Sequence, residues 1–78
     1  MTKPPELAHL GSALRNIRLR AGFRYGKDIA RAAGLTPSQV SLWETGTQVP
    51  NLANLLRYLR ACRATLTTLD QEIATLGK

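Results

Sequence analysis

Apolar residues recur at intervals of three and four along most of the chain, which is the period of amphipathic helices. The first such stripe consists of Leu7, Leu10, Leu14, Ile17 and, at its end, Ala21. Gly22 closes this segment, while Pro5 suits a first helical turn and Glu6 suits the positive end of a helix dipole. The pattern predicts a helix over residues 5–21.

Residues 27–46 contain two short helical patterns separated by a glycine. The apolar stripe of the first pattern consists of Ile29, Ala30 and Ala33. Gly34 ends this helix, because glycine adopts a left-handed backbone without steric cost. Thr36 is a favourable N-cap for the next helix, and Pro37 suits its first position.

The second of these helices, residues 37–45, carries an inward pair, Val40 and Trp43, and ends at Gly46. Two helices with so short a connection cross steeply, as they do in a helix-turn-helix motif. In that motif the second helix enters the major groove of DNA. The first functional hypothesis is therefore that residues 37–45 read DNA.

Two leucine-rich segments complete the chain. Their apolar positions are Leu52, Leu55, Leu56 and Leu59 in the first and Leu66, Leu69, Ile73 and Leu76 in the second. Asn51 is a credible N-cap for the first segment, and Cys62 fits a small buried hydrophobe near its end. We therefore predict an all-α fold of five helices in one domain, residues 1–78. Its core covers about residues 6–62, and residues 63–78 form a C-terminal helix.

The composition adds a charge argument to this picture. Lysine and arginine total 11 against 5 acidic residues, which gives a formal net charge of +6. Such an excess attracts polyanions such as nucleic acids, although solubility alone is the alternative explanation. One cysteine and one histidine are too few for a structural zinc site, so we expect no metal and no other cofactor.

The sequence also argues against catalysis and against a membrane location. His9 has no placed partner and the acidic residues are scattered, so we do not expect an enzyme. The chain has no apolar run of about 20 residues that would span a bilayer, and its first ten residues lack the apolar core of a signal peptide. A cytoplasmic location is expected.

Five short patterns occur in order: L-G-x-x-L-R-x-I-R-x-x-x-G at 10–22, I-A-x-x-A-G-L-T at 29–36, V-S-x-W-E-x-G at 40–46, P-N-L-x-x-L at 50–55 and A-x-x-A-T-L at 61–66. Together they resemble the phage-repressor and Cro-like helix-turn-helix family, also called the XRE family, over about residues 10–69. The resemblance implies a lambda-repressor-like bundle of five helices. It also implies a bacterial or phage-encoded transcription regulator, such as a repressor, that binds double-stranded DNA as a homodimer on a palindromic operator.

The resemblance assigns roles to individual residues. Arg18 matches a first-helix arginine that forms a structural salt bridge with the glutamate closing the recognition helix, here Glu44; a DNA contact is the alternative for Arg18. The residues expected to contact bases are Thr36, Pro37, Ser38, Gln39, Ser41 and Leu42. The residues expected to contact phosphates are Tyr25, Gly26, Lys27, Thr45, Thr47, Gln48 and Asn51.

The residues expected to contact bases have unusual side chains for that role. Gln39 is its only long polar side chain that could read a base bidentately. Pro37 and Leu42 offer apolar contact, which suits thymine methyl groups, although an exposed leucine also fits a partner contact or a plain surface position. Gly26 stands where the family usually has glutamine, so Lys27 or the helix amides would replace that phosphate contact.

The C-terminal segment raises the question of a partner. Arg63 stands where the family favours glycine, which implies a different bend into the last helix. We expect an isologous dimer interface, with packing inside the chain as the alternative. Its expected residues are Leu59, Leu66, Leu69, Ile73 and Leu76. A second function remains open, that of an antitoxin that binds a toxin and autoregulates its operon; a polymerase contact is also not excluded.

Overall fold

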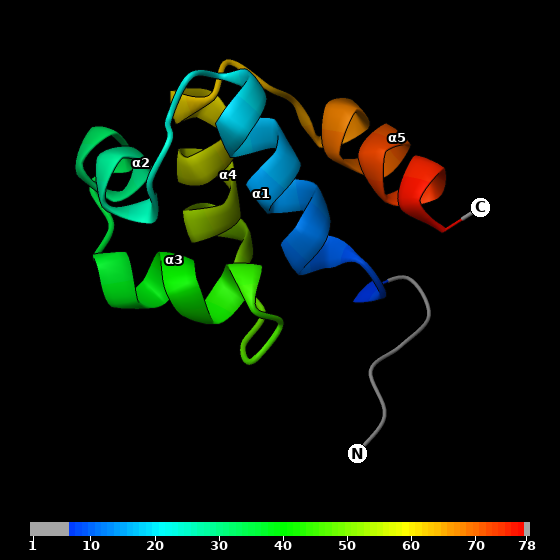
Figure 1. The fold of residues 1–78 in the computed structure, drawn as a ribbon, viewed down its shortest axis with the longest axis horizontal. Helices are drawn as coiled ribbons and strands as arrows, with labels where there is room; N and C mark the ends of the chain where they lie inside the picture. Colours follow the sequence, from blue (N-terminus) through cyan, green and yellow to red (C-terminus); the bar gives the residue numbers. More distant parts are fainter. Residues whose placement is uncertain (1–6, 78) are drawn as a thin grey trace.

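The computed structural model describes residues 7–77, and within that range it contains five helices and no strand (Figure 1). The helices are α1 (Leu10–Arg20), α2 (Gly26–Ala33), α3 (Pro37–Glu44), α4 (Leu52–Ala61) and α5 (Leu66–Leu76). In Figure 1, α1 and α4 occupy the centre, α2 and α5 lie on opposite sides of them, and α3 crosses one end. The predicted all-α fold of five helices is confirmed.

Every helix contributes to one apolar core. Its buried members are Leu10, Ala13, Leu14, Ile17, Ile29, Ala30, Val40, Trp43, Tyr58, Leu59, Cys62 and Leu69. Val40 and Trp43 are both almost fully buried, so the inward pair predicted for the DNA-reading helix is confirmed. α1 packs against α3 and α5, while α2 packs against α3 and α4. The core therefore fixes α3 through two neighbouring helices.

The first helix is shorter than its apolar stripe suggested. α1 begins at Leu10, because His9 before it has a left-handed backbone with φ of 68°. Leu7 precedes the helix, although it packs against the core. Pro5 and Glu6, which we expected in the first turn, lie outside the described residues.

α1 ends just before a glycine, as predicted. Gly22 has φ of 94°, and the amide of Phe23 donates to the carbonyl of Arg18 at 3.1 Å, which closes the helix as a Schellman motif does. Ala21 is the C-cap residue and is exposed, so it does not extend the buried stripe as we expected.

The buried face of α4 also differs from the expected one. Leu52 is 62% exposed, because it is the first residue of the helix and lies at the edge of the core. Tyr58 is fully buried instead, beside Leu59 and, one turn later, Cys62. A stripe counted from aliphatic residues alone missed the tyrosine at the centre of this face.

Arg63 adopts the backbone conformation that the family usually assigns to glycine. Its φ is 56°, and the amide of Ala64 donates to the carbonyl of Leu59 at 2.8 Å, so α4 ends in a Schellman motif. The different bend expected after α4 is therefore wrong. The chain forms the usual turn with a residue that is strained in it.

Replacing Arg63 with glycine is expected to raise the free energy of unfolding by about 1 kcal/mol, because glycine is not strained at positive φ. Urea denaturation followed by the fluorescence of Trp43 measures this change. Arg57→Gly is the matched control, since it removes the same charge from the interior of α4 and is expected to cost about 1 kcal/mol. A loss of stability in both variants would contradict the strain at Arg63.

Candidate nucleic-acid interface

The candidate reading helix α3 starts from a well-formed cap. The amide of Gln39 donates to the Thr36 hydroxyl at 3.1 Å, and the Gln39 side-chain oxygen accepts from the Thr36 amide at 3.0 Å. These reciprocal bonds form a capping box, and Pro37 occupies the first helical position as predicted. The turn from α2 into α3 is therefore rigid, with Gly34 at φ of 72° completing it.

The outward face of α3 presents small side chains. Thr36, Pro37, Ser38 and Ser41 are exposed, whereas Leu42 and Gln39 are half-buried. The cap changes the expectation for Gln39, because bidentate recognition of adenine needs both the amide oxygen and the amide nitrogen. The oxygen of Gln39 accepts from both the Thr36 amide and the Thr36 hydroxyl, so in this conformation its NH₂ group is the part left for DNA.

The other end of α3 is held by a buried ion pair. The Arg18 Nε and Nη2 atoms donate to the two carboxylate oxygens of Glu44 at 2.9 and 3.0 Å. Burial alone would lower the pKa of the Arg18 guanidinium, but the hydrogen bonds and charge of Glu44 outweigh it, and the pKa is raised. Arg15 adds a weaker contact to Glu44 at 3.6 Å from a half-exposed position.

Arg18 also connects α3 to the start of α2. Its Nη1 atom donates to the carbonyl oxygens of Phe23 and Arg24 at 2.9 and 2.7 Å. One guanidinium therefore links α1, the turn before α2 and the end of α3. With this many partners inside the protein, Arg18 has a structural position rather than a DNA-facing one.

Gly11 permits α1 to approach the end of α3 at very short range. A Cβ atom at this position would lie 2.5 Å from the Glu44 carbonyl oxygen and 2.7 Å from the Trp43 carbonyl oxygen. Both neighbours are backbone atoms of α3, which cannot move aside as a flexible side chain does. The close packing of α1 on α3 therefore explains why the L-G pattern has glycine at position 11.

Tyr58 is a residue of this site that the sequence analysis did not single out. Its hydroxyl lies 2.6 Å from the Glu44 carboxylate and 3.0 Å from the Leu14 carbonyl oxygen, both buried acceptors. Burial, followed by the hydrogen bond and charge of Glu44, raises the pKa of the Tyr58 phenol, so it stays protonated and remains a donor. No sequence pattern revealed this contact, because Tyr58 and Glu44 are 14 residues apart.

The start of α2 gathers cationic and aromatic side chains. The exposed ring of Tyr25 lies 5.4 Å from the Arg24 guanidinium carbon and 5.6 Å from the Lys27 ammonium, both within cation–π range. Gly26 is the first residue of α2, and a Cβ there would lie 3.3 Å from a methyl group of Val40. A side chain at this position would begin with a slightly tight contact to Val40, so glycine eases the packing of α2 on α3.

The loop after α3 folds back over the helix end. The amides of Thr47 and Gln48 both donate to the Leu42 carbonyl oxygen, at 2.9 and 3.1 Å. The Thr45 hydroxyl donates to the Ser41 carbonyl at 2.9 Å, and the Asn51 side-chain oxygen caps α4. The Thr47 hydroxyl lies 3.0 Å from the Thr45 hydroxyl oxygen and donates to it, because the Thr45 proton is already used by the Ser41 carbonyl. The Asn51 NH₂ group and the exposed Gln48 side chain remain for a phosphate.

The five residues expected at a dimer interface differ in burial and fall into three groups. Leu59 is 1% exposed and Leu69 is 5% exposed, so both belong to the core of the chain itself, and their assignment to a dimer surface is wrong. Ile73 and Leu76 are partly buried against the core. Leu66 alone of the five remains largely accessible, at 48%.

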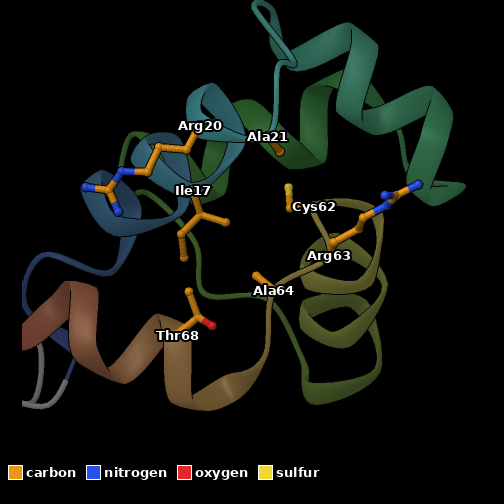
Figure 2. Close-up of a pocket in the computed structure, with 7 residues that line it drawn as sticks. All are labelled: Ile17, Arg20, Ala21, Cys62, Arg63, Ala64 and Thr68. Atoms are coloured by element: carbon orange, nitrogen blue, oxygen red, sulfur yellow. The ribbon is translucent and has the colours of Figure 1, made fainter.

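A hollow of about 170 Å³ lies where the ends of α1 and α4 meet the start of α5 (Figure 2). Ile17, Cys62 and Thr68 line it, whereas Arg20 and Arg63 point away from it in opposite directions. Its volume is below the roughly 300–1,000 Å³ of typical ligand pockets. Burial raises the pKa of the Cys62 thiol to about 11, so the thiol is neutral near pH 7. The hollow does not resemble a binding site for an effector.

Two further properties concern only residues 7–77. No helix in this range combines the length and the apolar character that crossing a bilayer requires. The same residues contain no group of three or more histidine, cysteine, aspartate or glutamate side chains that could hold a metal ion.

The five-helix core, the α2–α3 pair joined by a short turn and the exposed face of α3 define a helix-turn-helix bundle. A helix-turn-helix domain family matches residues 9–71, which is most of the chain. The chain belongs to this family of XRE-like DNA-binding domains, so it is a helix-turn-helix DNA-binding protein. Comparisons with curated proteins and with solved structures found no match.

Proposed function

We propose that the protein is a transcription regulator that binds a specific operator in double-stranded DNA, with α3 in the major groove. The observation that carries this proposal is the rigid presentation of α3. Its N-terminal end is fixed by the capping box, its C-terminal end by Glu44, and its outer face is exposed between them. A helix held in this way can offer the same side chains to every half-site.

Phosphate contacts are assigned to the two segments that flank α3. Tyr25 is the N-cap of α2, and Gly26 and Lys27 begin that helix on one side, while Gln48 and Asn51 follow α3 on the other. Backbone amides at helix starts and cationic side chains are common phosphate ligands. The Arg24–Tyr25–Lys27 stack supplies positive charge where the usual glutamine is missing.

Base recognition is assigned mainly to Pro37, Ser38 and Leu42, with Thr36, Gln39 and Ser41 beside them. This surface makes few hydrogen bonds to base edges, so part of the specificity is assigned to DNA shape and deformability. Selection of bound sequences from random DNA tests the proposal. An enriched palindrome is expected, and affinity for it should fall steeply with salt because counterions are released from the phosphates. Selection without any enriched sequence would refute an operator-specific regulator.

Leu42→Ala is expected to weaken binding to the selected operator on the order of tenfold, the scale of one mismatched base pair, because it removes an apolar contact to the bases. Binding to random DNA should change little, since phosphate contacts dominate it. Titrations of both DNAs by fluorescence anisotropy measure the two effects. Leu19→Ala, at a half-exposed leucine outside α3, is the matched control and should leave both affinities unchanged.

A homodimer is the proposed active form, because a palindrome presents two identical half-sites. Two accessible apolar surfaces are available for its interface. One is Leu66 with the outer parts of Ile73 and Leu76 on α5, and the other is Val49 with Leu52 at the α3–α4 loop. We assign the interface to α5, because three apolar residues of one helix form the longer stripe.

Light scattering at micromolar concentration tests the homodimer, and Leu66→Lys should shift a dimer to a monomer. Leu52→Lys is the matched control at the other surface. If Leu52→Lys dissociates the dimer and Leu66→Lys does not, the interface lies at the α3–α4 loop. A wild-type chain that is strictly monomeric would refute the homodimer. It would favour the antitoxin alternative, in which the exposed leucines contact a toxin.

A further inference from the structure

Three residues hold the C-terminal end of α3 through contacts with Trp43 or Glu44. Gly11 of α1 lets the backbone of α1 pack against the carbonyl groups of both residues. Arg18 of α1 binds both carboxylate oxygens of Glu44. Tyr58, on α4, supplies the third contact, although α4 packs mainly against α2.

Tyr58 touches α3 in two different ways. Its hydroxyl donates to the Glu44 carboxylate at 2.6 Å, which is short for a neutral donor and fits a charged acceptor. Its ring lies edge-on to the ring of Trp43, with centroids 6.4 Å apart and an interplanar angle of 63°. The same side chain therefore fixes two successive residues of the reading helix.

The surroundings of Tyr58 leave it little freedom. The residue is fully buried, and its hydroxyl also lies 3.0 Å from the Leu14 carbonyl oxygen on α1. The phenol proton is placed between two fixed acceptors, and every buried side-chain nitrogen or oxygen within residues 7–77 has a hydrogen-bond partner. A fully satisfied buried network of this kind specifies one arrangement of the helices around it.

We propose that Tyr58 is a positioning residue for DNA recognition, which acts through Glu44 and Trp43 to set the orientation of α3. The proposal rests on the proposed function of α3 as the reading helix. Leu42 directly precedes Trp43, so a small rotation of the helix end moves the candidate base contact. Phosphate contacts from α2 are expected to change less, because the turn before α2 is bonded by Arg18, which the Tyr58 variant retains.

Tyr58→Phe tests this role, because it removes the hydroxyl and keeps the ring. Affinity for the selected operator is expected to fall about tenfold, the scale of one mismatched base pair. Affinity for random DNA should stay within about twofold, because phosphate contacts dominate it. The ratio of the two affinities is the decisive readout, since partial unfolding lowers both affinities by the same factor.

Ile17→Val is the matched control, since it removes one methylene group from the core beside the hollow where α1, α4 and α5 meet, and it leaves the hydrogen bonds to Glu44 in place. It should lower stability while leaving the affinity ratio unchanged. If Tyr58→Phe alone does not fold, the same change is made together with Arg63→Gly, which restores stability at the turn that ends α4. The emission of Trp43, the single tryptophan, is expected to shift in the folded Tyr58→Phe chain.

The outcomes separate this proposal from the proposed function. A wild-type chain that does not discriminate between operator and random DNA refutes the proposed function and this role with it. A wild-type chain that discriminates, with an unchanged affinity ratio in Tyr58→Phe, overturns only the role of Tyr58. A fall of the ratio in Ile17→Val as large as in Tyr58→Phe would overturn it as well.

Discussion

Replacing Arg18 with methionine is expected to lower the free energy of unfolding by about 3–5 kcal/mol, the typical cost of stranding one partner of a buried ion pair. The variant keeps an apolar side chain of similar length but removes both hydrogen bonds to Glu44 and both bonds to the turn before α2. Domains of this size are stable by only about 5–15 kcal/mol, so the loss is a large fraction of the total. Urea denaturation followed by Trp43 fluorescence measures it.

Two further variants make this prediction specific. Arg57→Met replaces an exposed arginine of α4 and should change stability by less than about 0.5 kcal/mol. The double variant Arg18→Met, Glu44→Leu removes the stranded carboxylate, so it should be more stable than Arg18→Met alone. If the double variant loses as much free energy of unfolding as Arg18→Met and Glu44→Leu lose when added together, the two residues are not coupled.

Gly11→Ala is expected to lower the free energy of unfolding by about 1–3 kcal/mol, although alanine is normally the better helix former. The added methyl group would lie 2.5 Å from one α3 carbonyl oxygen and 2.7 Å from the next, so α1 and α3 must separate. Displacement of α3 should also weaken binding to the operator more than binding to random DNA. Thermal unfolding and the two DNA titrations measure these effects.

The control for Gly11→Ala is Gly77→Ala at the end of α5. There the added Cβ would lie 3.4 Å from its nearest neighbour, and the backbone φ of −81° suits alanine. This variant should be neutral or slightly stabilising. Equal losses in the two variants would rule out the close approach of α1 to α3 as the cause.

The fold was predictable because its information is local. The spacing of Val40 and Trp43, the cap at Thr36 and the glycines at 22, 34 and 46 each act within one or two helical turns. Such signals depend on backbone geometry and on one buried face, both of which a short sequence window contains. The helix order and the helix-turn-helix motif followed from them.

The errors arose where a position depends on distant parts of the chain. Leu59 and Leu69 had the spacing of an interface stripe, but the core of a 78-residue domain needed them, and no local pattern distinguishes the two uses. Leu52 had the spacing of a core residue but lies at the rim. Burial is a property of the whole packing arrangement, so periodicity alone assigned these residues incorrectly.

The sequence by itself determined the five helices, the helix-turn-helix and the basic character of the chain, because periodicity, capping residues and charge depend on the residue types in short stretches of the chain. Only the tertiary structure decided how α3 is held. It brought Tyr58 within 2.6 Å of Glu44 and placed Gly11 against the α3 backbone. Those contacts join residues 14 and more than 30 positions apart, and their geometry exists only once α1, α3 and α4 have packed on one core.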